Sequence, residues 1–338
     1  NDRWSWVEQS LLAPVTTLAL LNVFAPDEVQ QRAREMFCLE KHSEIASVFT
    51  CEVRSNLRSM ATFVDDDEGG VPRPSGALRE CGDALLPCCF LSGASILAAQ
   101  ALNVKPGDRV LDLCAGPGAK AVVLAMSLFG SLFSQTVSRS AVSDVREQRG
   151  LLVCNEPDRR RRALLEGILK SCVPGDLLVK GGSIVLTRAE ATRRVPPSLS
   201  RFGLFDKVLV DPPCSALRRL AKQGGRAGSR QKASGGFQGN DQEVKVHSER
   251  MDELLRCAGA LLRPGGLIVF CTSSVDEREN DEAVRRFLRR GDDFHVLEPA
   301  DDEPIDGAER LELGVQLLPD QGTLHGPLFL ARLRRRSG

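Results

Sequence analysis

The sequence predicts an α/β fold: a mainly parallel sheet with helices on both faces, preceded by a helical N-terminal segment. From residue 91 onward, short apolar runs alternate with amphipathic stretches of helical length. Strands that alternate with helices in this way form βαβ units, which build parallel sheets. Residues 1–65 instead place apolar residues at helical spacing, through 7–21 and 29–37.

The alternating region contains five apolar runs that predict strands, over 109–115, 151–156, 183–187, 205–211 and 267–272. Helices are predicted over 91–102, 120–128, 159–169, 244–262 and 277–290. Proline and glycine end two of these helices, at Pro106-Gly107 and at Pro264-Gly265-Gly266. Ligands of an open parallel sheet bind outside the carboxyl ends of its strands, so we expect the functional residues there.

An acidic and then Gly/Pro-rich stretch over 65–74 marks the best domain boundary. We therefore predict a helical N-terminal extension over residues 1–70 and a larger domain over 71–338. Residues 129–149 are long for a connection between a helix and a strand, and they predict an insertion.

Composition excludes several classes of protein. Lys+Arg and Asp+Glu both number 45, so the charge balance does not indicate a globally basic nucleic-acid binder. The apolar runs are shorter than the roughly 18 residues of a membrane span. Eleven cysteines without a CxxC pair, and four histidines, predict neither a zinc site nor a secreted disulfide framework. The chain begins at Asn1 without an initiator Met, which is typical of a processed or truncated chain.

A Gly-rich turn follows the first predicted strand, in the motif Asp112-Leu-Cys-Ala-Gly-Pro-Gly-Ala-Lys120. Gly116 and Gly118 allow the backbone to approach a ligand closely, and the N-terminus of the next helix can receive a carboxylate or phosphate. Their spacing, with Ala121, matches the dinucleotide fingerprint. By itself this motif fits a nicotinamide, a flavin or S-adenosylmethionine (SAM).

The acid Glu156 ends the second predicted strand, where a carboxylate can accept hydrogen bonds from both ribose hydroxyls. It follows Gly118 by 38 residues, against about 20 in nicotinamide folds. The predicted insertion accounts for the excess, so this spacing disfavours a nicotinamide only mildly.

The motif Asp211-Pro-Pro-Cys214 ends the fourth predicted strand and favours SAM. SAM enzymes that act on bases place Asp/Asn-Pro-Pro and a fourth residue beside the methyl group. An aromatic fourth residue stacks on an exocyclic amine, whereas a cysteine indicates carbon chemistry on a pyrimidine ring. C5 of cytosine becomes nucleophilic when a thiolate adds at C6, which is covalent catalysis by an activated cysteine.

In these motifs the chain resembles the RNA (cytosine-5) methyltransferases of the Sun/Fmu (RsmB-like) family. That family reads roughly DLCAAPGGKT, an acid after the second strand, Asp in the loop after the third, DxPCS, and TCS after a PGG turn. The matching segments here are 112–120, 155–156, 187–190, 211–215, 264–266 and 272–274. The resemblance covers about 90–338 and implies a Rossmann-like SAM-dependent methyltransferase fold.

Segments 171–176 and 326–334 are similar to the mitochondrial ribosomal-RNA branch of that family, as is the helical extension over 1–70. The resemblance implies S-adenosyl-L-methionine as the cofactor, ribosomal RNA of a large-subunit assembly intermediate as the substrate, and the mitochondrial matrix as the location. It also implies a helical-repeat partner of the mitochondrial termination-factor type. Apolar run lengths and Cys/His spacing predict neither a membrane nor a metal.

The resemblance implies roles for individual residues. Asp112 and the turn would hold the methionine end of SAM, Glu156 the ribose and Glu190 the adenine amine. Asp211 would face the cytosine edge and the cofactor, and Cys214 would assist release of the methylated product. The expected cofactor residues are Asp112, Cys114, Ala115, Gly116, Pro117, Gly118, Lys120, Glu156, Glu190 and Asp211.

A basic, Gly-rich loop over 212–240 follows the fourth predicted strand. It is either a plain solvated loop or an RNA contact, and its place at the expected active edge favours RNA. It carries no acid, and its six cations are Arg218, Arg219, Lys222, Arg226, Arg230 and Lys232.

Ser273 is the main departure from the family. The family's nucleophile is the cysteine of TCS, and a serine hydroxyl in its place needs an adjacent base. Cys271 shares the same face of the strand, but about 6.6 Å away, so it does not simply replace that cysteine. Three functions stay open: binding of RNA and SAM without methylation, methylation with Cys214 as nucleophile, or a different SAM-dependent reaction. We predict the first.

Overall fold

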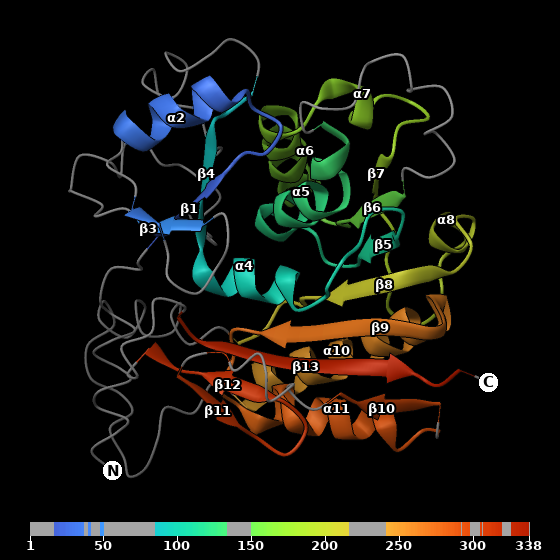
Figure 1. The fold of residues 1–338 in the computed structure, drawn as a ribbon. Coiled ribbons are helices and arrows are strands. Elements are labelled where there is room, and N and C mark those ends of the chain that lie inside the picture. The colour runs from blue at the N-terminus through green and yellow to red at the C-terminus, as the bar shows by residue number, and fades with distance from the viewer. Residues whose placement is uncertain are drawn as a thin grey trace. The chain divides into compact units, whose positions relative to one another are not determined.

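The structure is a computed structural model (Figure 1) that describes residues 17–36, 40–41, 48–50, 85–133, 150–215, 241–291, 293–297, 305, 307–319 and 326–337. The chain divides into two compact units. The first unit spans Thr16–Glu190, and the second unit contains Ala191–Gly338.

The first unit begins with a four-stranded sheet of order β2-β3-β1-β4. Its strands are β1 (Thr17–Leu21), β2 (Glu40–Lys41), β3 (Val48–Thr50) and β4 (Cys88–Ser92), all paired antiparallel. Helix α2 (Asp27–Met36) follows β1 and confirms the helix predicted over 29–37 in its described residues.

The helix predicted over 7–21 is wrong for residues 17–21, which form β1. The helical prediction for residues 1–65 is also wrong at 40–41 and 48–50, which form β2 and β3. Residues 18–21 are all buried, and β1 lies between β3 and β4. A short apolar run that is buried on every side does not show a period of two, so it reads equally well as helix or strand. Residues 7–16 and the boundary predicted over 65–74 lie outside the described residues, so the division into 1–70 and 71–338 stays a prediction.

The rest of the first unit is a parallel sheet covered by helices. The strands are β5 (Arg109–Asp112), β6 (Leu151–Asn155) and β7 (Ile184–Thr187), and the helices are α4 (Gly93–Gln100), α5 (Ala119–Phe133), α6 (Arg159–Cys172) and α7 (Gly175–Leu178). β6 pairs parallel with both β5 and β7, which confirms the first three predicted strands. α5 extends to Phe133 because the apolar run continues, and the remainder of the predicted insertion lies outside the described residues.

The second unit also begins with parallel strands. β8 (Phe205–Val210) pairs parallel with β9 (Leu262–Thr272), so the carboxyl ends of both strands lie at one edge. The predicted Pro-Gly-Gly turn falls inside β9, where the pairing with β8 shifts register and Gly265 has φ +74°. The helices are α8 (Pro197–Ser200), α10 (Asp241–Leu261) and α11 (Asp281–Leu288), with a 3₁₀ turn η3 (Glu277–Glu279).

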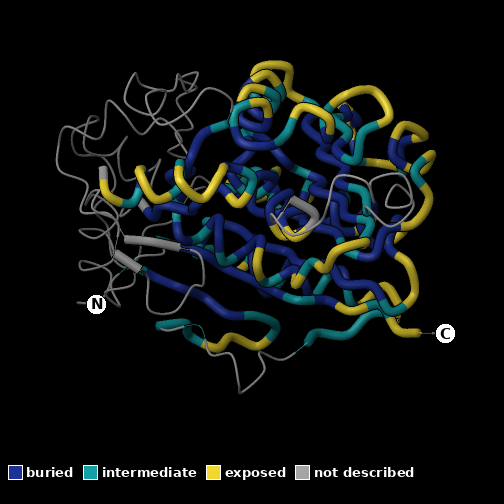
Figure 2. Tube along the Cα trace, turned by 45° about the horizontal axis from the view of Figure 1, so that its top comes forward, coloured by how far each residue is buried: buried dark blue, intermediate teal, exposed yellow. Residues whose placement is uncertain are grey.

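Four further strands of the second unit are not predicted by the sequence pattern. They are β10 (Phe294–Val296), β11 (Ala308–Arg310), β12 (Val315–Leu317) and β13 (Leu328–Arg335). β13 pairs antiparallel with β9, and β10 and β12 pair antiparallel with β13. Buried residues gather in the strands and in the helices that accompany them, α5 and α10 above all (Figure 2). The antiparallel strands β10 to β13 do not alter the predicted parallel strands or the positions of their carboxyl ends.

Candidate functional site

Three neighbouring strand ends form the edge of the first unit that the sequence predicts to bind a cofactor. Asp112 lies at the end of β5, Asn155 at the end of β6 and Thr187 at the end of β7, in parallel register. The segments that follow them therefore lie at one edge of the sheet, as strand ends do in ligand-binding α/β folds. This edge brings together the Gly-rich turn, Glu156 and the segment that leads to Glu190.

Asn155 ties these three strand ends together. Its Nδ2 donates hydrogen bonds to the carbonyl oxygens of Leu113, at 3.1 Å, and Ala189, at 3.0 Å. Its Oδ1 accepts from the Thr187 hydroxyl at 2.9 Å and from the Ala189 N–H at 2.7 Å. A buried amide has two donors and two acceptor lone pairs, and all four are used here. The sequence motifs mark Asn155 only as the neighbour of Glu156 and do not predict this role.

Glu156 is buried, and its carboxylate is bound to the Gly-rich turn. Oε2 accepts a hydrogen bond from the Gly116 N–H at 3.2 Å, and Oε1 accepts one from the Asp158 N–H at 2.9 Å. Arg161 forms an ion pair with the same carboxylate at 3.2 Å and donates to the Gly116 carbonyl oxygen. The acid therefore has a fixed position beside the turn.

The two glycines of the turn are required for different reasons. A Cβ at Gly116 would collide with the Glu156 carboxylate. Gly118 has φ +126°, and a Cβ there would lie 3.3 Å from the Cα of Leu165 in α6. The turn needs Gly116 to bring an acid close and Gly118 to bring α6 close.

The residues of this edge fit a nucleoside cofactor that also carries an amino acid. The turn opens the fifteen-residue helix α5, whose first N–H groups can bind a carboxylate. Glu156 is a fixed acceptor, and Glu190 is an exposed one. Lys120 donates a hydrogen bond to Ser95 Oγ at 3.3 Å, so it also contacts α4. Cys114 and Pro117 are half-buried in the turn, and Ala115 is buried.

The edge of the second unit carries the residues predicted for base chemistry. Asp211 follows β8 directly, and Cys214 lies three residues further on. The Cys214 Sγ lies 3.2 Å from the Ser273 Oγ, just beyond the end of β9. Residues predicted from two separate motifs are thus in contact, and we call them the Cys214–Ser273 pair.

Cys271 does not take the place of Ser273, as the strand geometry predicts. Its Sγ donates a hydrogen bond to Asp211 Oδ1 at 3.5 Å, while Ser273 contacts Cys214. Cys271 is fully buried and Ser273 is half-buried. The two side chains on one face of β9 therefore face two different residues of the segment after β8.

Other thiols are poor candidates for a nucleophile. Burial raises the pKa of Cys154, and the nearby charge of Asp112 raises it further. Burial raises the pKa of Cys257 to about 11. The hydrogen bond with Cys172, together with burial, raises the pKa of Cys89. These three groups remain thiols at neutral pH, and a thiol is not the nucleophilic form.

Glu279 of η3 contacts both segments of the second edge and was missed by the sequence reading. Its carboxylate accepts hydrogen bonds from Ser215, after Cys214, and from Ser274, after Ser273. The signal was present as an acid six residues beyond Ser273, but a helix that follows a strand commonly begins with acids, so position alone did not mark it.

The predicted RNA contacts Arg218, Arg219, Lys222, Arg226, Arg230 and Lys232 lie outside the described residues. Among the described residues, no helix is long and apolar enough to span a membrane. The same part of the chain contains no cluster of three or more His, Cys, Asp or Glu that could hold a metal ion.

The order of these motifs along the chain matches a known family. The family model described as 16S rRNA methyltransferase RsmB/F matches residues 140–334, more than half of the chain. The chain belongs to the RsmB/F family. RsmB/F proteins are SAM-dependent methyltransferases, which confirms the cofactor predicted from the motifs.

Curated relatives of this RsmB/F chain include two mouse proteins. One is the mitochondrial tRNA (cytosine(34)-C(5))-methyltransferase, 28% identical over 73% of this chain and 63% of its own length. The other is the 5-cytosine rRNA methyltransferase NSUN4, 24% identical over 99% of this chain and 85% of its own length. The chain thus spans less than two thirds of the first of these relatives.

Two solved structures from Pyrococcus horikoshii share the fold. A methyltransferase homolog protein covers 98% of this chain and 90% of its own, at a TM-score of 0.61 and 18% identity. NSun6 covers 100% of this chain and 95% of its own, at a TM-score of 0.65 and 16% identity. These structures confirm the predicted α/β methyltransferase fold class.

Proposed function

We propose that this chain binds SAM and RNA through the RsmB/F fold and does not form 5-methylcytosine. The observation that carries the proposal is Ser273, which lies against Cys214 where the family resemblance expects the nucleophilic cysteine. The proposed function is therefore that of an RNA-binding factor in the assembly of the mitochondrial large ribosomal subunit.

The first unit would hold the cofactor, which supplies a methyl group when it is bound. Glu156 would accept hydrogen bonds from the ribose hydroxyls, and Glu190 would accept from the adenine amine. Asp112 and the turn from Cys114 to Gly118 would hold the methionine end. The fixed position of Glu156 supports this assignment, because a pre-positioned acceptor loses little entropy when it binds a ligand.

The second unit would receive the cytosine, with Asp211 at the base edge and the Cys214–Ser273 pair at the ring. The step that the pair cannot perform is addition of a nucleophile to C6. A hydroxyl ionises far above neutral pH, and it needs an adjacent base to attack. The hydrogen-bond partner of Ser273 in the described residues is the Cys214 thiol, which is not such a base.

The substrate class and the location rest on the relatives. The NSUN4 relative, aligned over nearly the whole chain, is named a 5-cytosine rRNA methyltransferase, and this supports ribosomal RNA. The tRNA methyltransferase relatives from mouse and zebrafish are named mitochondrial, which supports a mitochondrial protein, placed by our proposal in the matrix. A helical-repeat partner of the termination-factor type would dock on residues 1–70.

A second function is favoured by a specific observation, the half-buried Cys214 thiol at the edge of the second unit. In that case Cys214 itself adds to C6, and the chain is an active RNA (cytosine-5) methyltransferase.

Sequencing of 5-methylcytosine in mitochondrial RNA, in cells with and without this protein, separates the two functions. The proposed function predicts an unchanged methylation map together with a loss of assembled large subunits. A cytosine whose methylation disappears with the protein, and returns with wild type but not with Cys214→Ala, establishes the second function instead.

A further inference from the structure

The segments that carry the Cys214–Ser273 pair are joined one residue further along the chain. Ser215 follows Cys214, and Ser274 follows Ser273, at the adjacent ends of the parallel strands β8 and β9. The Ser215 and Ser274 hydroxyl oxygens lie 3.4 Å apart. Whatever holds these two serines also sets the distance between the thiol and the hydroxyl of the pair.

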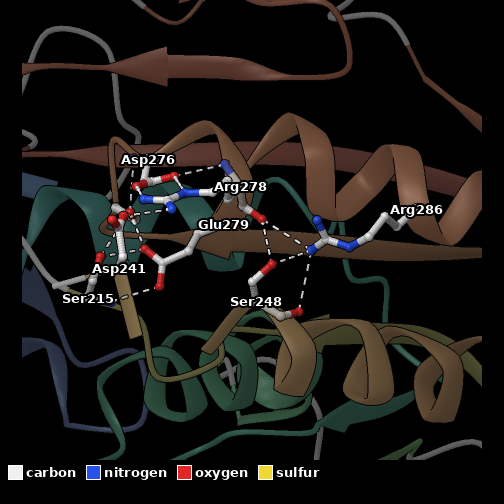
Figure 3. A network of polar contacts seen from close by, with 8 residues as sticks. Ser215, Asp241, Ser248, Asp276, Arg278, Glu279 and Arg286 are labelled. Atoms are coloured by element: carbon white, nitrogen blue, oxygen red, sulfur yellow. Dashed lines mark hydrogen bonds and ion pairs between the residues drawn. The ribbon is translucent and has the colours of Figure 1, made fainter. Parts of the chain in front are cut away.

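Glu279 contacts both serines through one carboxylate. Its Oε1 accepts a hydrogen bond from the Ser215 N–H at 3.0 Å, and its Oε2 accepts one from the Ser215 hydroxyl at 2.5 Å. The same Oε2 accepts from the Ser274 hydroxyl. Figure 3 shows the Glu279 carboxylate directed toward Ser215. A backbone group and two side chains from two strand ends therefore meet on one acid.

The burial of this cluster makes the contacts strong. Glu279 is 0% exposed, Ser274 1% and Ser215 4%. A buried carboxylate is costly unless its lone pairs are filled, and here neutral donors fill them. Hydrogen bonds to an ionised acceptor are shorter and stronger than those between neutral groups. Loss of the carboxylate would therefore release both segments.

Glu279 is itself held by its neighbours in sequence. The Asp276 carboxylate accepts a hydrogen bond from the Arg278 N–H at 3.0 Å, which caps η3, and it forms an ion pair with the Arg278 guanidinium at 2.6 Å. Asn280 Oδ1 accepts from the Thr272 hydroxyl at 2.6 Å, and its Nδ2 donates to the Ser274 carbonyl oxygen at 2.9 Å. The turn is thus fastened to the end of β9.

We propose that Glu279 is a positioning residue of the base-modifying site, which holds Cys214 and Ser273 at a fixed separation by binding Ser215 and Ser274. The proposal deepens the proposed function and rests on it for the meaning of the site. The carboxylate is fully buried, so it acts through its neighbours and does not touch the base. A misplacement of about 1 Å costs on the order of 10²-fold in the rate of reaction between two groups, so a reaction between residues 214 and 273 reports their separation.

Disulfide formation measures this separation without any methyl transfer. In Ser273→Cys, the introduced thiol lies opposite Cys214, where the present Sγ–Oγ distance is 3.2 Å. A disulfide needs about 2.05 Å, a small movement. The full-length variant is treated with oxidised glutathione, which accepts two electrons and two protons from the thiol pair and leaves as two reduced glutathiones. Peptide mapping by mass spectrometry measures the rate at which residue 214 becomes linked to residue 273.

We expect rapid linkage in Ser273→Cys and in Ser273→Cys/Glu277→Ala. Glu277 is the matched control, because it belongs to the same η3 turn and its side chain is 75% exposed. Ser273→Cys/Glu279→Ala should be linked about tenfold or more slowly, since hydrogen bonds to a charged group are lost. Ser273→Cys/Glu279→Gln should recover most of the rate, because a Gln amide can accept from the Ser215 N–H and donate to both hydroxyls, which can rotate.

Melting temperatures accompany each rate, so that unfolding is not mistaken for misalignment. If Glu279→Ala does not fold, the double variant Ser215→Ala/Ser274→Ala on the Ser273→Cys background tests the same contacts and should be linked more slowly than the control. Equal rates with and without the Glu279 contacts would overturn the proposal, and so would the failure of Ser273→Cys alone to form the disulfide. Neither result depends on SAM binding or on methylation, so the proposed function fails or stands separately.

Discussion

The Glu156 carboxylate accepts a hydrogen bond from the Gly116 N–H, 3.2 Å away, so an acid at the end of β6 occupies the space beside the glycine of the turn. A methyl group at Gly116 would collide with that carboxylate. The acid and the glycine are therefore one structural element, although 40 residues separate them.

Gly116→Ala should weaken SAM binding more than it weakens the fold. The added Cβ displaces the Glu156 carboxylate, and we expect an affinity about tenfold lower by calorimetry. Gly167→Ala is the matched control: a Cβ there meets nothing within 4 Å in α6, and alanine favours a helix by about 0.5–1 kcal/mol. Unchanged affinity in Gly116→Ala would show that Glu156 can move without consequence for the ligand.

Glu156→Ala should lower SAM affinity by about 10- to 100-fold, because hydrogen bonds from ligand hydroxyls to a carboxylate each contribute about 1.5–3 kcal/mol. Glu166→Ala serves as the control, since Glu166 is a half-exposed acid of α6 that pairs with Lys170. Calorimetry on the two variants and wild type makes the comparison. Equal affinity in all three contradicts the assignment of Glu156, and the absence of binding to wild type contradicts SAM binding by the isolated chain.

Low pH should lower the stability of the second unit through protonation of Asp276. The hydrogen bond from Arg278 lowers the pKa of Asp276 below its ordinary value. A carboxyl group whose pKa is lowered by folding contributes stability that is present above its unfolded pKa, about 4, and is lost as the pH falls through the lowered folded pKa. Asp276→Asn should therefore flatten the pH dependence of the unfolding free energy below about pH 5.

Urea unfolding at a series of pH values measures this effect. Asp241→Asn is the comparison, because the Asp241 side chain also pairs with Arg278 but is 79% exposed, where an ion pair contributes little. We expect the unfolding free energy of wild type to fall more steeply at low pH than that of Asp276→Asn. Equal pH dependence in the two proteins would exclude the Asp276–Arg278 contact as a source of acid sensitivity.

RNA binding by the isolated chain should be weak and strongly dependent on salt. The chain has zero net charge, and the loop over 212–240 carries six cations without an acid. Each cation that contacts a phosphate adds about 0.7 to the slope of log affinity against log salt for single strands. Replacement of the six loop cations by Ala should reduce that slope, whereas equal slopes would make the loop an ordinary solvated one. Filter binding at several salt concentrations gives both slopes.

Much of this fold follows from local pattern. The five predicted strands and most predicted helices are present because apolar runs alternate with amphipathic stretches between Pro and Gly signals. Thr17–Leu21 was predicted as helix and forms a strand, since its burial comes from β3 and β4, partners far away in the sequence. The antiparallel strands β10 to β13 were missed for the same reason: β13 is defined by its pairing with β9, which no local signal encodes.

The site divides along the same line. The motifs predict that Gly116, Glu156, Cys214 and Ser273 lie at strand ends, because cofactor binding and base chemistry require these residue types at this spacing. Asn155 and Glu279 bind these motifs to one another. Asn155 contacts Thr187, 32 residues away, and Glu279 contacts Ser215, 64 residues away. A residue that supports a site through hydrogen bonds across strands has no spacing that marks it, so the sequence alone did not identify it.

Ser273→Cys should create methyl transfer that wild type lacks. The variant restores a thiol opposite Cys214, and a thiol with an ordinary pKa of about 8.5 is partly ionised near neutral pH, whereas a hydroxyl is not. We expect no 5-methylcytosine from wild type on its natural RNA, and a measurable rate from Ser273→Cys in a radiolabelled methyl-transfer assay. Cys214→Ala is the control for the other thiol.

Wild type, Ser273→Cys and Cys214→Ala distinguish the two functions, because covalent addition to C6 is the step that we propose wild type cannot perform. SAM and RNA affinity should be the same in wild type and Ser273→Cys, so a gain in transfer cannot come from binding. Ser273→Thr keeps a hydroxyl and should remain inactive, which separates the thiol from a change of residue at that position. Robust transfer by wild type that disappears in Cys214→Ala would reverse the conclusion, because the Cys214 thiol, 3.2 Å from the serine hydroxyl, would then be the nucleophile.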